Sequence, residues 1–337
     1  MKQRKVTLGE VAQVAGVSRA TVSLVVRKSP LVADHTRQKV EQVLVDLDYV
    51  HDIGAARLRN NSSRTIGVIV PNLVNSFFTE FLSGVEQMMS EDDRVVLLAN
   101  SDDDLTRQSQ ILQRFRGHGV DGVILCPAEG TDPQLPLRMR QWGLPLVQSL
   151  REVGDNATDY AGADYIKGVQ LAVGHLVEHG HRQIAFLSVS ARTSARVERL
   201  EGFSRAIAGT KAQNAGIVEA ELSWEGAAQS AAKVLALQGT PSAVLCFNDV
   251  LAAGLMLGLR RAGREPGRDI AVVGLDDLPL AELTFPPMTS VAMCPERIGA
   301  AAARLLARRL QSPDAPVERS VVAPSLMIRE SSNLSVS

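Results

Sequence analysis

The sequence is poor in aromatic residues and in cysteine, and it has no long hydrophobic run. Phe, Trp and Tyr make up 4% of its 337 residues, so a folded core must be built mainly from aliphatic side chains. Its three cysteines, Cys126, Cys246 and Cys294, are widely spaced. This spacing excludes a disulfide framework or a CxxC metal site and is typical of the reducing cytosol. No apolar stretch approaches the roughly 20 residues of a membrane span, and the basic N-terminus lacks the apolar segment of a signal peptide. We therefore expect a cytoplasmic protein without a membrane partner.

The sequence also lacks the common signatures of catalysis. It contains no GxGxxG, Walker A or GxSxG motif and no defensible Cys–His pair, so we expect no enzyme, no catalytic residues and no cofactor. His175 and His179 are one helical turn apart, and His181 follows closely. No acid or cysteine is spaced to complete a ligand set, so we expect no metal site.

Charge is distributed unevenly along the chain. Residues 1–65 contain 11 Lys and Arg against 6 Asp and Glu, a net charge of +5, whereas the remainder carries −6. A basic segment attached to an acidic body indicates a module that binds a polyanion, although a difference of this size also arises by chance.

Hydrophobic periodicity divides the chain into a helical head and an alternating body. Helices are predicted at 8–15, 18–28 and 34–49, followed by a polar joint at 52–64. Short apolar runs that indicate buried strands then alternate with helical segments. These runs are 65–70, 94–100, 120–126, 145–150, 159–164, 184–189, 216–222, 242–247 and 270–277. Such alternation predicts parallel sheets covered by helices on both faces. Nine strands over about 265 residues exceed one comfortable core, so two doubly wound lobes are expected.

The two short helices at the head have the pattern of a helix-turn-helix. Gly16 suits a tight turn that needs positive φ, and Ser18 suits an N-cap. On the second helix Val22, Val25 and Val26 share one face, whereas Arg19, Ala20, Ser23, Leu24 and Arg27 lie on or beside the opposite one. Arg19 could pair with guanine, Ser23 with a base or phosphate, and Leu24 with a thymine methyl. The alternative is an ordinary helical hairpin with a solvated face.

These segments resemble the LacI/GalR (lactose-repressor/galactose-repressor) family of bacterial transcription regulators. The residues that carry the resemblance include TLGEVAQVAGVSRATVSLVV, ARLRNNSSRTIGVIVPNLVNSFFTEF, PSAVLCFNDVLAAG and IAVVGLDD, and it extends over essentially the whole chain. The resemblance implies an all-α helix-turn-helix headpiece (1–50), a hinge helix or linker (51–63) and an α/β periplasmic-binding-protein-like core (64–337). The implied N-lobe covers about 64–163 plus 293–322, and the implied C-lobe covers about 164–292 plus 323–331.

The resemblance also implies a set of DNA-binding residues and a homodimer on a pseudo-palindromic double-stranded operator. In the family a leucine of the hinge enters the minor groove, and Leu58 occupies that position here, although an isolated helix of this length is not stable. Without the family a flexible linker would be the simpler interpretation. The expected DNA-binding residues are Thr7, Ser18, Arg19, Ala20, Thr21, Ser23, Leu24, Arg27, Thr36, Arg37, Ala55, Arg57 and Leu58.

Polar residues follow several predicted strands, where ligands of parallel sheets bind. Carboxylate, amide and guanidinium groups beside aromatic rings suit a polyhydroxylated effector. Each of these residues has a structural alternative as a helix cap, a surface ion pair or part of the core. The expected effector-binding residues are Asn72, Asn75, Phe77, Phe78, Arg199, Leu222, Asn248, Asp276 and Met293. Leu222 and Met293 stand where the family often has an aromatic and a polar residue, so we expect a more apolar pocket than a typical hexose site.

The resulting prediction is a sequence-specific transcriptional regulator, expected to be a repressor, whose operator affinity is controlled by a small-molecule effector such as a sugar or sugar derivative. Two alternatives stay open: a sugar-binding protein without DNA function, and a corepressor-dependent regulator of the purine type. A third, a Rossmann-like enzyme, is disfavoured by the missing phosphate loop.

Overall fold

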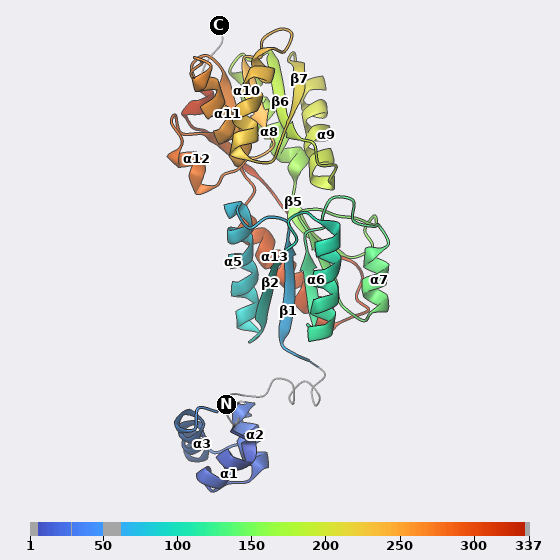
Figure 1. Cartoon of the computed structure of the whole chain (residues 1–337), viewed down its shortest axis with the longest axis vertical. Helices are drawn as coiled ribbons and strands as arrows, with labels where there is room; N and C mark the ends of the chain where they lie inside the picture. The colour runs from blue at the N-terminus through green and yellow to red at the C-terminus, as the bar shows by residue number, and fades with distance from the viewer. Residues whose placement is uncertain (1–5, 28, 50–61, 334–337) are drawn as a thin grey trace. The chain divides into compact units, whose positions relative to one another are not determined.

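A computed structural model describes residues 6–27, 29–49 and 62–333 of the chain. The chain divides into two compact units, Met1–Ser63 and Arg64–Ser337. Figure 1 shows both units and labels most of their helices and some of their strands.

The first unit is a cluster of three helices: α1 (Leu8–Ala15), α2 (Arg19–Val26) and α3 (Asp34–Asp46). Thr7 and Glu10 form a capping box at the start of α1, and Gly16 ends this helix with a φ of 65°. A non-glycine residue would be strained at that φ, which explains the glycine in the turn before α2. Aliphatic side chains from all three helices fill the core, among them Val11, Val22 and Val40. The three predicted helices are confirmed.

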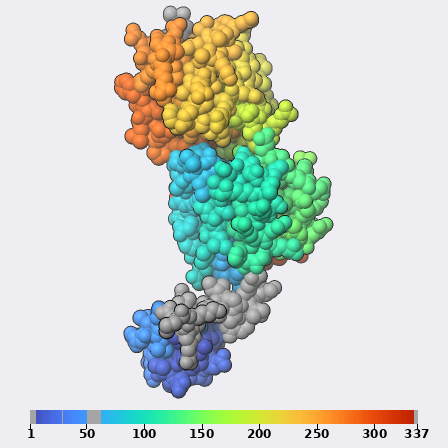
Figure 2. Space-filling model, viewed as in Figure 1, coloured from blue at the N-terminus to red at the C-terminus, as the bar shows by residue number. Residues whose placement is uncertain are grey.

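The second unit consists of two lobes, each built on a six-stranded sheet. The N-lobe contains β1 (Thr65–Val70), α5 (Ser76–Glu91), β2 (Val95–Asn100), α6 (Leu105–His118), β3 (Gly122–Leu125), α7 (Leu135–Gln141), β4 (Leu146–Ser149), β5 (Asp159–Ala163), α13 (Pro295–Gln311) and β11 (Arg319–Val322). The C-lobe contains α8 (Tyr165–Glu178), β6 (Gln183–Val189), α9 (Ser194–Ala208), β7 (Gln213–Ala220), α10 (Trp224–Leu235), β8 (Ala243–Cys246), α11 (Asp249–Arg261), β9 (Ala271–Asp276), α12 (Pro279–Leu283), β10 (Thr289–Ala292), β12 (Ser325–Met327) and the 3₁₀ helix η1 (Glu330–Ser332). In Figure 2 the blue-green N-lobe and the yellow-orange C-lobe meet along a constriction.

Both sheets are parallel except at one edge. Their strand orders are β11-β5-β4-β3-β1-β2 and β12-β10-β9-β8-β6-β7, and among the strands of the described residues only β12 runs antiparallel to its neighbour. The chain passes between the lobes three times: after β5, after β10 and after β11. All nine predicted strands are present, whereas β10, β11 and β12 were not predicted. These three are only three or four residues long, and β11 and β12 are exposed or half-buried along most of their length, so no long apolar run marks them.

Helices cover both faces of the N-lobe sheet. Ile124 of β3 faces the apolar cluster that contains residues of α5 and α13, whereas its neighbours Val123 and Leu125 face the cluster of α6 and α7. Alternate residues of one strand are therefore buried on opposite sides, as a doubly wound sheet requires. The predicted fold class, a helical headpiece with a two-lobed parallel-sheet core, is confirmed.

Two glycines allow α5 and α13 to pack backbone against backbone. A Cβ atom added at Gly84 would lie 1.9 Å from the carbonyl oxygen of Glu296, and one at Gly299 would lie 1.9 Å from that of Phe81. Among the described residues, no helix is both long enough and apolar enough to span a membrane.

Candidate functional site

The first candidate site is the exposed face of α2 in the helical unit. The Ser18 side chain caps the helix by accepting a 3.0 Å hydrogen bond from the Thr21 amide. Val22 and Val25 are buried against α1 and α3, whereas Arg19, Ala20 and Arg27 are exposed. The helix therefore packs through one face and presents a short cationic face on the other.

Leu24 and Ser23 of this face are not simply exposed to solvent. Leu24 is half-buried and packs against the headpiece core, so only part of its side chain is available at the surface. The Arg27 guanidinium donates to the Ser23 hydroxyl at 2.7 Å and to the Ser23 carbonyl at 3.2 Å. This pair is therefore held in one arrangement along the helix.

The remaining predicted DNA-binding residues fall into two groups. Thr7 shares the capping box of α1, Thr36 bonds to the adjacent His35 ring, and Arg37 donates to the carbonyl of Ser29 at 2.6 Å. Arg37 is half-buried and so also holds the segment between α2 and α3. Ala55, Arg57 and Leu58 lie outside the described residues.

The second candidate site is a cavity of about 300 Å³ between the lobes of the core. Its wall is formed where strands end and helices begin: Pro71 and Asn72 follow β1, Phe247 and Asn248 follow β8, and Asp276 ends β9. Eight of the nine predicted effector residues line it. The complete lining is Pro71, Asn72, Asn75, Phe77, Phe78, Asp102, Asp103, Cys126, Leu150, Arg151, Tyr165, Ala195, Arg199, Glu221, Leu222, Phe247, Asn248 and Asp276.

Arg199 is the most constrained cation of this cavity. Its guanidinium carbon lies 3.9 Å from the ring centroid of Tyr165 and 4.3 Å from that of Phe247. The side chain is 5% exposed. One terminal nitrogen donates to the Ala195 carbonyl at 3.1 Å, whereas the buried Nε has no hydrogen-bond partner among the described residues. Two rings thus hold the flat cation, and its hydrogen-bonding capacity is incompletely used.

Asp276 faces this cation from β9. Burial raises the pKa of the Asp276 carboxyl well above its ordinary value, the nearby Asp249 raises it further, and the positive charge of Arg199 opposes the shift. Burial likewise raises the pKa of the Tyr165 hydroxyl. The carboxyl and hydroxyl are therefore poised to donate as well as accept hydrogen bonds at the cavity wall.

Several charged lining residues were not predicted. Arg151, after β4, pairs with Asp103 at 2.6 Å, and Asp103 and Asp102 follow β2. The strand-end rule that selected Asn248 and Asp276 applies equally to these strands, so it could have found them. With Glu221 on the opposite lobe, they add four charged side chains to a lining that was expected to be more apolar than a typical hexose site.

Met293 does not belong to this lining. Its side chain is fully buried, and a Cβ added at Gly168 would meet the Met293 methyl carbon at 2.7 Å. It therefore packs against α8 inside the protein and is not brought to the cavity. Met293 directly follows β10 and was expected at the wall from the family resemblance, but packing beside α8 makes it part of the core.

The histidines that raised the question of a metal are engaged elsewhere. The His175 Nε2 atom bonds to the Ser332 hydroxyl at 2.7 Å, and His179 Nδ1 bonds to the His175 carbonyl. In the described part of the chain, no group of three or more His, Cys, Asp and Glu side chains is arranged to hold a metal ion.

Besides the hydrogen bond that the Tyr165 hydroxyl donates to the Leu150 carbonyl at 3.4 Å, two hydrogen bonds join the lobes next to the cavity. The Glu129 carboxylate of the N-lobe accepts from the Arg192 amide of the C-lobe at 2.6 Å. The Glu152 amide donates to the Ser194 hydroxyl at 2.9 Å. Glu152 and Ser194 directly neighbour the lining residues Arg151 and Ala195, so the spacing of the lobes and the shape of the cavity are linked.

A helix-turn-helix unit joined to a two-lobed core with a cavity between the lobes defines a ligand-controlled DNA-binding protein. Residues 7–52 match the model of bacterial regulatory proteins of the lacI family, and residues 173–332 match that of the periplasmic binding protein-like domain. A curated relative, the HTH-type transcriptional repressor PurR of Photobacterium profundum, is 33% identical over 331 residues, covering 96% of this chain and 98% of its own.

Solved structures give the same answer. The complex of the transcriptional regulator CelR with cellobiose is 31% identical, covers 97% of this chain and 100% of its own, and has a TM-score of 0.73. The Lac repressor dimer bound to operator and the anti-inducer ONPF is 25% identical, covers 98% and 99%, and has a TM-score of 0.86. The chain belongs to the LacI family, and it is a DNA-binding transcriptional regulator with an effector-binding core.

Proposed function

We propose that the chain acts as a homodimeric repressor whose affinity for a pseudo-palindromic operator is controlled by a neutral, polyhydroxylated effector in the interlobe cavity. The observation that carries this proposal is the convergence of amide, carboxyl, guanidinium and aromatic groups from both lobes on one cavity. A ligand that touches both lobes has a different affinity for each lobe spacing, which is the requirement for allosteric control.

The charge of the lining favours a neutral effector. Even with Asp276 neutral, three other carboxyl side chains face the cavity against two guanidinium groups, and Arg151 is already paired with Asp103. An added phosphate or carboxylate would lie near uncompensated negative charge, so a phosphorylated sugar is disfavoured. Hydroxyl groups can both accept from Arg199 and Asn248 and donate to Asp276, while the Phe77 and Phe78 rings cover apolar C–H faces.

The interlobe hydrogen bonds give the effector a mechanical route. The hydrogen bonds Glu129–Arg192 and Glu152–Ser194 join the two lobes. An opening of the cavity would stretch them, whereas an effector that holds the lobes at their present spacing would keep them. The resulting lobe shift in each subunit would change the spacing of the two headpieces on the operator.

Exposed apolar residues supply a surface for the second copy. Leu283 is 81% exposed and Phe285 76%, and a groove beside Trp224, Leu257 and Leu280 has a volume of about 560 Å³. The Lac repressor structure that resembles this chain over its full length is itself a dimer. A homodimer supplies two headpieces, which is the number that a palindromic operator requires.

The DNA function is tested by selecting, from a pool of random duplexes, those that bind the full-length protein. The affinity of the protein for the recovered sequence is then measured at several salt concentrations. We expect a pseudo-palindrome and a log–log salt slope of about −0.9 for each phosphate contacted. Recovery of no shared sequence would contradict the proposal. Light scattering should give a dimer, and a monomer at micromolar concentration would contradict the assembly.

The effector is sought by thermal shift with cellobiose, other neutral sugars, phosphorylated sugars and nucleobases. We expect stabilisation by a neutral sugar that Asp276→Asn weakens and that Met293→Leu, the matched buried control, leaves unchanged. Stabilisation by a nucleobase alone would favour the purine-type regulator, and stabilisation by phosphorylated sugars alone would overturn the charge argument.

A further inference from the structure

The turn that carries Asp276 is conformationally strained. Asp276 has a φ of 122° and Asp277 a φ of 55°, so two consecutive non-glycine residues lie in the region that favours glycine. Such a conformation is strained in a non-glycine residue and persists only where surrounding contacts hold it. The contacts that hold this turn therefore decide where the Asp276 carboxyl points.

Those contacts converge on the buried residue Asp249. One carboxyl oxygen of Asp249 accepts from the Leu278 amide at 2.8 Å, directly after the strained pair. The other accepts from the Ser290 hydroxyl at 2.5 Å. The Ser290 oxygen in turn accepts from the Asp277 amide at 3.0 Å. Both backbone amides that follow Asp276 are thus bound, directly or through Ser290, to one side chain.

The sequence makes room for this side chain at one glycine. A Cβ added at Gly274 would lie 2.1 Å from the Asp249 carboxyl oxygen. Gly274 belongs to β9, so the absence of its side chain lets the carboxyl lie against the strand that ends in Asp276. Asp249 also follows Asn248, the cap of α11 and a lining residue of the cavity. One side chain therefore connects the two strand ends that supply Asn248 and Asp276.

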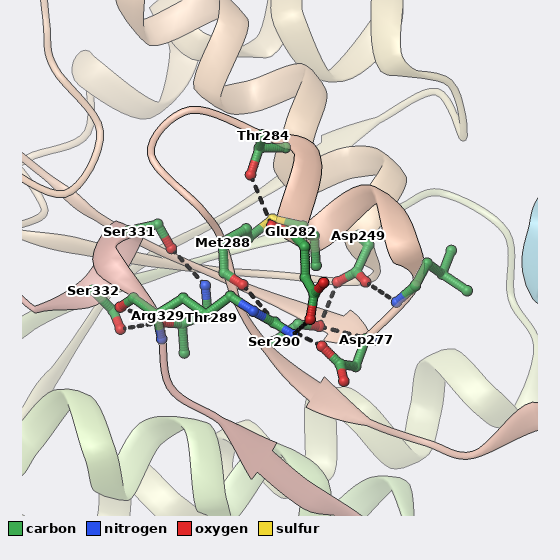
Figure 3. A network of polar contacts seen from close by, with 12 residues as sticks. Asp249, Asp277, Glu282, Thr284, Met288, Thr289, Ser290, Arg329, Ser331 and Ser332 are labelled. Carbon is green, nitrogen blue, oxygen red and sulfur yellow. Dashed lines mark hydrogen bonds and ion pairs between the residues drawn. The ribbon is translucent and has the colours of Figure 1, made fainter.

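Arg329 holds the same turn from the C-terminal segment. Its guanidinium pairs with the Asp277 carboxylate at 2.7 Å and donates to the Met288 carbonyl at 3.0 Å, and both charged side chains are about 15% exposed. A second terminal nitrogen reaches the exposed Glu282 at 3.2 Å. Figure 3 shows Arg329 between Asp277 and Glu282, with Asp249 beside Ser290.

The segment that carries Arg329 is itself fixed to the sheet. The Arg329 amide donates to the Thr289 hydroxyl at 2.8 Å, and that hydroxyl donates to the Arg329 carbonyl at 2.9 Å. The Ser331 hydroxyl donates to the Val272 carbonyl of β9 at 2.6 Å. The Ser332 hydroxyl bonds to Thr289 and to His175 of α8, both at 2.7 Å. Arg329 therefore reaches the turn from a rigid base.

We propose that Asp249, Ser290 and Arg329 are positioning residues that fix the Asp276 carboxyl on the cavity wall. The role of Asp276 as an effector ligand rests on the proposed function, whereas the positioning itself is a property of the free protein. Loss of the set should release the strained turn and withdraw Asp276 from the lining, while β8 and the rest of the C-lobe stay folded.

The test is amide hydrogen exchange of the full chain carrying Ser290→Ala. We expect the Asp277 and Leu278 amides to exchange about tenfold faster, since each loses a hydrogen bond or its support. The matched control is Ser188→Ala, a fully buried serine of β6 whose hydroxyl bonds only within its own strand among the described residues. It should leave the turn unchanged. Amides of β8 should be unchanged in both variants.

A second pair of variants distinguishes the contacts of Arg329 with the turn from a general loss of stability. Arg329→Met should accelerate exchange at the turn, whereas Glu282→Gln, which removes only the exposed arm of the same guanidinium, should not. Unchanged exchange at the turn in Ser290→Ala, or equal acceleration throughout the C-lobe, would overturn the proposal. A crystal structure of Ser290→Ala in which Asp276 superposes on the wild-type side chain would do the same. Neither measurement uses effector or DNA. A failed effector screen would therefore count against the proposed function without affecting the test of the positioning residues.

Discussion

Arg199→Met should separate effector binding from stability. Arg199 is 5% exposed, lies between the rings of Tyr165 and Phe247, and has a buried Nε without a hydrogen-bond partner among the described residues. Methionine keeps much of the aliphatic volume but loses two cation–π contacts, at about 0.5–2 kcal/mol each. It also removes an unsatisfied buried donor, which costs the wild type about 1–3 kcal/mol. The loss of about 1–4 kcal/mol in total and the gain of about 1–3 kcal/mol differ by about 0.5 kcal/mol at their midpoints, so we expect the free energy of unfolding to change by less than about 1 kcal/mol.

The companion carboxyl does not alter this balance. Burial raises the pKa of the Asp276 carboxyl and the charge of Arg199 lowers it, so removing the cation shifts this carboxyl further toward its neutral form. No unpaired buried charge is then created, and the large penalty of a broken buried ion pair does not apply. Effector binding should nevertheless fall about 10- to 150-fold, because a hydrogen bond from a charged donor contributes about 1.5–3 kcal/mol.

The assay combines urea denaturation of the ligand-free protein with calorimetric titration of the sugar found by thermal shift. Arg199→Lys is the control, since it keeps the charge but not the planar group that lies between the rings. Its affinity should be intermediate. A loss of more than about 3 kcal/mol of stability in Arg199→Met would show that the cation is structural. An unchanged sugar affinity would show that it does not touch the effector.

Four further predictions concern other parts of the chain. Gly299→Ala should cost about 3 kcal/mol in urea denaturation, because its Cβ would lie 1.9 Å from a carbonyl oxygen of α5, whereas Gly174→Ala, with nothing within 4 Å, should be neutral or stabilising. Burial raises the pKa of Asp249 to about 7 from 3.8, so the folded state holds a proton that the unfolded chain releases. Wild-type stability should therefore fall as the pH rises from about 4 to 7, and Asp249→Asn should flatten that profile of melting temperature; parallel profiles would contradict the assignment. Leu24→Gln should change the operator sequence recovered by selection while leaving affinity for random DNA within about twofold. Leu58→Ala should weaken operator binding far more than binding to random DNA, and equal losses would exclude a minor-groove wedge.

Local sequence was sufficient for the helical head. Gly16 at positive φ and the Ser18 cap are consequences of backbone preference within a few residues, and the spacing of Val22 and Val25 alone indicates the buried face of α2. Preferences of this kind act between residues that are close in sequence, so they can be inferred without knowledge of the tertiary structure. The exposed residues of that face followed from the same projection, although the partial burial of Leu24 depended on packing against the neighbouring helices.

The body of the protein was predictable to the extent that parallel sheets obey a general rule. Because ligands bind at the carboxyl ends of parallel strands, the ends of β1, β8 and β9 predicted Asn72, Asn248 and Asp276 as neighbours, and all three line one cavity. The rule also explains why Arg151 and Asp103 share that cavity, although they were not selected. The amino-acid sequence alone therefore determined the two doubly wound lobes and several of the residues that line the cavity between them.

Tertiary structure alone decided which side chains turn toward the cavity and what holds them there. Met293 follows a strand of the same sheet, yet packing beside Gly168 of α8 buries it away from the wall. Asp249 stands beside Asn248 in sequence but is turned onto β9, where it meets Ser290, 41 residues further along the chain. Side-chain direction at a strand end depends on contacts between segments distant in sequence, and no local pattern records those contacts.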